Sequence, residues 1–197
     1  DAETGEPLEG AIIVAQWILF EGGIGHGGHG RSIEVLEAVT DKEGKFTILG
    51  WGPKRRPAFT YLDNWDPLFS IFKSGYKYTR LINAPFEEFS RMYPNYKEMD
   101  TDKLLDFILT HNLESKDAVR TSIWNDTVIR LRKFKGNEND WLDELQKVLS
   151  DLGRRENLKK VRKLLESLNN EKTRFHPGNI RAKIFFEHTE ELFRKAR

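Results

Sequence analysis

Two segments, each a polar turn followed by a candidate strand, constrain the fold of this chain most strongly. The first has a turn with Gly5 before the apolar run of residues 11–20. The second is the turn of residues 41–44, after which Phe46 and Ile48 alternate with polar neighbours. Turns of this composition, followed by side chains of period two, are typical of antiparallel strands. The two units therefore predict an antiparallel β-structure.

The composition excludes several classes of partner and chemistry. The 197 residues include 32 basic and 31 acidic side chains, so the net charge of +1 provides no field that would gather nucleic acid or anionic lipid. The absence of cysteine excludes disulfides, thiolate zinc sites and a cysteine nucleophile. No apolar run reaches the roughly 20 residues of a membrane span, so we expect no transmembrane segment. Because the net charge is close to zero, we also expect no nucleic-acid partner.

The first part of the chain, residues 1–136, reads as one β-domain with a helical insertion at about residues 85–120. Gly136 ends the last predicted strand, and the insertion contains a short helix over residues 86–92 and a clearer one over residues 101–111. The predicted strands cover residues 11–20, 33–40, 45–49, 58–61, 68–73, 78–82 and 127–134.

The remainder, residues 137–197, reads as a helical C-terminal region. Apolar residues recur at helical spacing over residues 140–152, 156–168 and 180–193. Such stripes need a surface to cover them, so we expect these helices to pack together or back onto the β-domain.

Three motifs together resemble the carboxypeptidase regulatory-like domains. They are Asp-Ala-Glu-Thr-Gly-Glu-Pro-Leu-Glu-Gly-Ala at residues 1–11, Thr-Asp-Lys-Glu-Gly-Lys-Phe-Thr-Ile at 40–48, and Phe-Lys-Ser-Gly-Tyr at 72–76. The turn at 50–52, the helical insertion and the segment 129–136 are similar to a group of uncharacterised bacterial proteins, secreted or lipid-anchored, that carry this domain.

This resemblance implies a mainly β fold with α elements, a seven-stranded transthyretin-like antiparallel β-sandwich. It also implies a periplasmic, cell-surface or extracellular location, either secreted or held by a lipid anchor upstream of the printed sequence. Domains of this kind begin with a strand before the turn at residues 1–5, and that strand is missing here. Either the start has been trimmed, or the sandwich has an incomplete edge that can take up an extended segment of another chain.

The glycine-rich loop of residues 22–30 is the most chemically suggestive segment. His26 and His29 lie on it and could share a zinc or copper ion. Further ligands would have to come from a set of dispersed side chains, namely Glu21, Glu34, His111, His176 and His188. The alternative is a solvated loop without metal. The loop lacks the Gly-x-x-x-x-Gly-Lys-Ser/Thr pattern, so we expect no nucleotide cofactor.

No catalytic set can be assembled from the sequence. The serines at positions 32, 70, 74 and 90 lack the Gly-x-Ser-x-Gly elbow of a serine hydrolase. The leading hypothesis is therefore a non-enzymatic binding or structural module of the cell envelope or exterior. It would bind a protein partner or self-associate by β-strand addition. The alternatives are a metal-binding protein that uses His26 and His29, and an accessory domain of an envelope enzyme.

Overall fold

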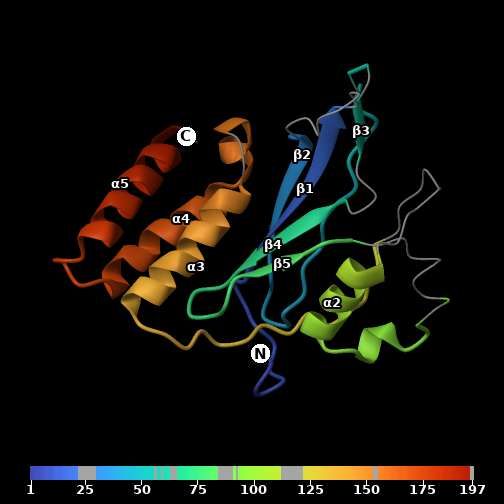
Figure 1. Ribbon diagram of the computed structural model, residues 1–197, viewed down its shortest axis with the longest axis horizontal. Coiled ribbons are helices and arrows are strands. Elements are labelled where there is room, and N and C mark those ends of the chain that lie inside the picture. Colours follow the sequence, from blue (N-terminus) through green and yellow to red (C-terminus); the bar gives the residue numbers. More distant parts are fainter. Residues whose placement is uncertain are drawn as a thin grey trace.

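The computed structural model describes residues 1–21, 30–55, 57–58, 60–62, 66–83, 91, 93–111, 122–152 and 155–195. Over these ranges one antiparallel sheet is accompanied by α-helices and short 3₁₀ helices (Figure 1). The strands are β1 (Ile12–Glu21), β2 (Arg31–Val39), β3 (Thr60–Leu62), β4 (Leu68–Phe72) and β5 (Thr79–Leu81). The helices are η1 (Tyr96–Glu98), α2 (Thr101–His111), α3 (Glu138–Asp151), η2 (Arg155–Lys160), α4 (Arg162–Asn170), η3 (Glu171–Arg174) and α5 (Ile180–Lys195).

Strand β1 is the centre of the sheet. The strand order is β2-β1-β4-β5, and β3 pairs with the far end of β1. Ile12 lies opposite Val39 of β2 on one side and opposite Phe72 of β4 on the other. Because β1 is paired along both edges and covered on both faces, residues 12–15 form an uninterrupted apolar run, as expected of a fully buried strand.

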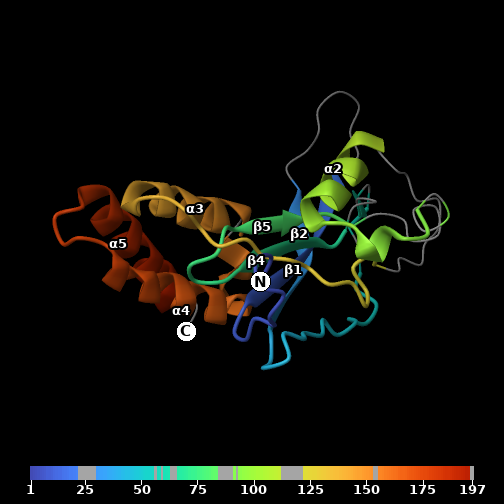
Figure 2. The ribbon, with the colours of Figure 1, turned by 90° about the horizontal axis from the view of Figure 1, so that it is seen from below.

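Helices α3, α4 and α5 cover one face of the sheet, and α2 lies on the other side (Figure 2). Ile12 and Val14 of β1 point toward the three helices and share one hydrophobic cluster with them. Trp141 of α3 stacks on Phe72, with ring centroids 6.3 Å apart. The C-terminal helices thus pack both with one another and back onto the sheet.

A capping box starts α3 at the point where the chain reaches this face. The side chain of Asn137 accepts hydrogen bonds from the N–H groups of Asn139 and Asp140, and the Asp140 carboxylate accepts one from the Asn137 N–H at 2.9 Å. This arrangement satisfies backbone donors that a helix start otherwise leaves open. It also sets the register that buries Trp141 and Leu145 against the sheet.

The other face is covered by α2 and by the loop that follows the insertion. Ile13 and Ala15 of β1 point this way and belong to a second cluster with Leu104 and Trp124. The indole N–H of Trp124 donates to the Ile82 carbonyl at 2.9 Å, which ties the loop to the sheet. Each face of the sheet therefore has its own apolar core.

Five of the predicted strands are confirmed as β1 to β5, with ends shifted by a few residues. The prediction of strands at 45–49 and 127–134 is wrong, because neither segment belongs to the sheet. The alternation itself is present: Phe46, Ile48 and Ile129 pack half-buried on the second cluster, whereas Leu49 and Val128 are exposed. Alternation of apolar and polar side chains indicates that one side of a segment is buried. It does not require the segment to be hydrogen-bonded to a neighbouring strand.

The predicted helices agree with the structure apart from one interruption. The helix over residues 101–111 is α2, and those over 140–152 and 180–193 are α3 and α5. The helix predicted over 156–168 is divided into η2 and α4, with Val161 between them in a non-helical conformation. The short helix predicted at 86–92 falls almost entirely outside the described residues.

Candidate functional site

The segment 131–134 lies beside the β4–β5 turn and is joined to it by an isolated β-bridge, outside the ladders of the sheet. The Lys77 N–H donates to the Arg132 carbonyl at 2.8 Å, and the Phe134 N–H donates to the Gly75 carbonyl at 2.9 Å. Gly75, with a φ of 80°, allows the tight turn between β4 and β5 that presents these partners. Tyr76 and Lys133 form the bridge between the two segments.

The backbone groups of Ile129, Leu131 and Lys133 form what we call the open edge. In an extended chain, successive residues direct their N–H and C=O groups to opposite sides. Since Arg132 and Phe134 bond toward residues 75–77, Leu131 and Lys133 face away from the sheet. The Arg130 N–H donates to the Thr101 Oγ1 at 3.0 Å on the inner side, so Ile129 also faces outward.

One position of the open edge is already filled by the chain itself. The Ala2 N–H donates to the Leu131 carbonyl at 2.8 Å, and Figure 1 shows the N-terminus beside the segment that leads to α3. The Asp1 carboxylate accepts a hydrogen bond from the Tyr76 hydroxyl at 2.8 Å and pairs with the Lys133 Nζ at 3.4 Å. Within the described part of the chain, the backbone groups of Ile129 and Lys133 have no hydrogen-bond partner.

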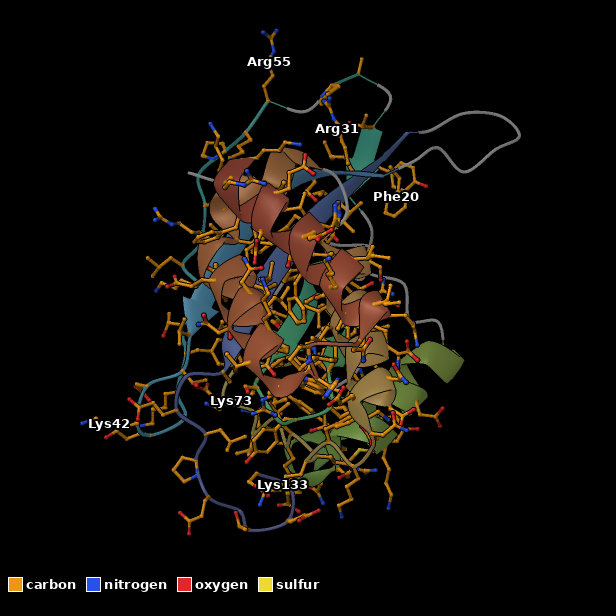
Figure 3. The ribbon with its side chains drawn as sticks, turned by 90° about the vertical axis from the view of Figure 1, so that its left-hand side faces the viewer. Phe20, Arg31, Lys42, Arg55, Lys73 and Lys133 are labelled. Atoms are coloured by element: carbon orange, nitrogen blue, oxygen red, sulfur yellow. The ribbon has the colours of Figure 1, made fainter. Side chains whose placement is uncertain are left out.

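A shallow groove of about 420 Å³ adjoins this edge. Figure 3 shows Lys133 at the end of the molecule where Lys73 also lies, far from Arg31 and Phe20. Four cationic and two anionic side chains contribute to the lining, which consists of Ala2, Glu3, Lys77, Arg132, Lys133, Phe134, Lys135 and Glu144.

Most of these cations have partners. Lys135 pairs with Glu3 at 2.9 Å, and Arg132 pairs with Asp102 at 2.9 Å. Lys77 has no ion pair among the residues that the structure describes. Burial lowers the pKa of the Asp1 ammonium, and Lys133 and Arg130 add to this effect against the opposing influence of Glu6. Lys77 is thus the lining cation without an ion pair among the described residues, and an acidic side chain of an occupant could pair with it.

A buried polar network fixes the inner wall of the groove. Glu144 of α3 accepts a hydrogen bond from the Tyr78 N–H at 3.1 Å, and the Tyr78 hydroxyl lies 2.8 Å from the Ser70 Oγ and 2.6 Å from the Asp151 Oδ2. Burial, followed by the hydrogen bond to Asp151, raises the pKa of Tyr78 well above its usual range. The phenol therefore stays neutral and links the last residue of α3 to the sheet, while the Tyr78 N–H holds Glu144 in the middle of the helix.

The opposite edge of the sheet, strand β2, is protected. The Glu34 carboxylate accepts a hydrogen bond from the Val35 N–H at 2.8 Å and ion-pairs with Lys54 and Lys160. Burial tends to raise the pKa of Glu34, but the two lysines and the Val35 N–H outweigh it and lower the pKa to about 2. A charged cluster beside an edge strand is a common protection against pairing with other chains.

The predicted metal ligands His26 and His29 lie outside the described residues, so zinc or copper binding stays a prediction. Of the proposed additional ligands, Glu34 is engaged with its two lysines. His176 precedes α5, where its Nδ1 accepts the Gly178 N–H at 3.1 Å. His188 lies on α5 beside α3. Within the described ranges, no group of three or more histidine or carboxylate side chains could hold a metal ion.

Sequence reasoning missed the open edge and the role of Asp1 and Ala2 at it. The signal was present in part, because the prediction placed a strand at 127–134 and noted an incomplete edge. What it lacked was the pairing of this segment with the β4–β5 turn.

Comparison with protein-family models, with curated proteins and with solved structures gives no match to this chain. None of the described helices is long and apolar enough to cross a membrane.

Proposed function

We propose that this protein is a non-enzymatic binding module of the cell envelope or exterior, whose open edge takes up an extended acidic segment of a partner protein. One observation carries the proposal: Ala2 fills a single position of the open edge, and the outward backbone groups of Ile129 and Lys133 on either side of it have no hydrogen-bond partner among the residues that the structure describes. Main-chain hydrogen bonds to such an edge provide affinity in β-strand addition, and neighbouring side chains provide specificity. The envelope location rests on the resemblance to carboxypeptidase regulatory-like domains.

The transthyretin-like sandwich belongs to the same proposal. Phe46 and Ile48 of the segment 45–49, and Ile129 and Leu131 of the segment 127–134, pack on the sheet face that lies opposite the three C-terminal helices. A second sheet of a sandwich would occupy this face. A strand added at the open edge would give the 127–134 segment a ladder partner and so supply part of that second layer.

The acidic character of the partner follows from the charges beside the open edge. Arg130 and Lys77 have no ion pair within the described residues, and the cations of the groove outnumber its carboxylates. An incoming strand with carboxylates on one face would meet these cations. It would displace the Ala2 N–H from the Leu131 carbonyl, so that its backbone could pair with Ile129, Leu131 and Lys133. Such charge complementarity contributes to specificity and association rate more than to affinity.

The test is a titration of the isotopically labelled chain with a strand-length synthetic peptide of alternating glutamate and valine. We expect shifts of the Ile129 and Lys133 amide resonances, and weaker binding by a peptide in which lysine replaces glutamate. Ile129→Pro should abolish binding, because it removes an outward N–H donor. Val128→Pro is the matched control and should retain binding, since the Val128 N–H faces inward.

Equal binding by the two proline variants, or no binding of the acidic peptide, would overturn the proposal. Shifts at Ile129 and Lys133 that depend only on protein concentration would identify a second copy of the chain as the partner, in place of an acidic segment of another protein.

A further inference from the structure

The outer side of α5 carries an apolar stripe that the fold does not use. Five large hydrophobic side chains are exposed among the described residues, and two of them lie one helical turn apart on α5: Ile180, 73% exposed, and Ile184, 62% exposed. Phe185 and Phe186 of the same helix are buried against α3 and α4. Figures 1 and 2 place α5 at the side of the molecule farthest from the sheet, and the exposure of both isoleucines shows that they face solvent.

A groove between α3 and α5 runs beside this stripe. Its volume is about 440 Å³, and it is lined by Gln146, Leu149, Ser150, Arg181, Ile184, Phe185 and His188. Ile184 forms part of its wall. An isoleucine from another molecule, placed next to Ile184, could therefore enter an apolar groove instead of lying on a flat surface.

We propose that this stripe is a homodimer interface, in which α5 packs antiparallel to α5 of a second copy around a two-fold axis at Ile184. In such a pair, residues at equal distances before and after position 184 meet. Arg181 then faces Glu187 of the second copy, and Ile180 faces His188. When two copies of α5 run antiparallel, the cation at position 181 of each meets the carboxylate at position 187 of the other. This charge complementarity of the helix with itself points to a second copy as the occupant.

The charges present in one chain fit this arrangement. Arg181 pairs with Asp143 of α3 at 2.7 Å, and both side chains are about half exposed. Glu187 has no ion pair within the part of the chain that the structure describes. In the dimer, Arg181 would lie between Asp143 of its own chain and the Glu187 carboxylate across the axis. The apolar contact supplies affinity, and the two symmetric ion pairs select the antiparallel orientation.

Sedimentation of the whole chain at concentrations up to about 1 mM tests the proposal. We expect a monomer–dimer equilibrium that Ile184→Glu weakens about tenfold or more. The matched control is Leu49→Glu, which adds the same charge at a residue that is 75% exposed and lies outside the helices. This control should leave the dimer unchanged, as should Ile129→Pro, so failure here is distinguishable from failure of the proposed function.

Charge reversal and cross-linking test the orientation. Arg181→Glu and Glu187→Arg should each weaken the dimer, and the double variant should recover most of the loss. Since the chain has no cysteine, Ile184→Cys should form a disulfide-linked dimer under mild oxidation far more readily than Leu49→Cys. A wild-type chain that stays monomeric, equal behaviour of the position 184 and position 49 variants, or no recovery in the double variant would each overturn the proposal.

Discussion

At the scale of single residues, Glu34 shows how one side chain protects an edge of the sheet. It is nearly buried on β2, yet it stays charged because Lys54 and Lys160 flank it and the Val35 N–H donates to it. We expect Glu34→Gln to lower the free energy of unfolding at neutral pH by about 1.5–3 kcal/mol, the usual contribution of hydrogen bonds to a charged group. Chemical denaturation of both proteins measures the difference.

The same residue predicts a dependence on pH. The pKa of Glu34 is lowered from 4.5 to about 2 in the folded protein, so its contribution is complete above pH 4.5 and is lost as the pH falls toward 2. The gap between wild type and Glu34→Gln should therefore close over this window. Glu166→Gln, on the exposed side of α4, is the control. A gap that stays constant down to pH 2 would show that the ion pairs do not stabilise the fold.

The sequence alone could not predict the roles of individual residues such as Glu34. Glu34 could be named only as a spare metal ligand, because its partner Lys160 lies 126 residues away and no local pattern links them. The same holds for Asp1, whose partners Tyr76 and Lys133 are brought near by the β4–β5 turn. Turn glycines were easier to identify: Gly5, Gly44 and Gly75 all adopt positive φ.

At the scale of elements, α3 depends on its first turn. Asn137→Ala removes the side chain that accepts two N–H groups and leaves them without a protein partner. We expect a loss of about 1 kcal/mol in the free energy of unfolding, measured by thermal or chemical denaturation. Asn137→Asp is the matched control, because it retains an acceptor and places a negative charge at the helix start. Similar losses in both variants would contradict the capping role.

The type of an element could be predicted from the sequence wherever the spacing of its apolar residues arises from the burial of one face of that element. The apolar stripes of α2, α3 and α5 are long enough to define helices, and each lies against the sheet or its neighbours. Segments 45–49 and 127–134 show the limit of this reasoning. Their alternation arises from half-burial on the sheet face, and pairing depends on where a second segment lies, which local sequence does not encode.

At the scale of the whole molecule, the sheet is covered on both faces but differs at its two edges. Helices α3, α4 and α5 close one face, and α2 with the 122–131 loop closes the other. One edge carries the Glu34 cluster, whereas the other ends in the open edge. The sheet would therefore grow in one direction only.

Amide hydrogen exchange of the isolated chain, resolved by residue, tests this asymmetry most directly. The amides of Ile129 and Lys133 should exchange about as fast as those of exposed loops, while Ile13 and Val14 in the central strand stay protected until the protein unfolds globally. Protection of Ile129 and Lys133 comparable to that of β1 would contradict the account, because it would mean that the edge is already paired.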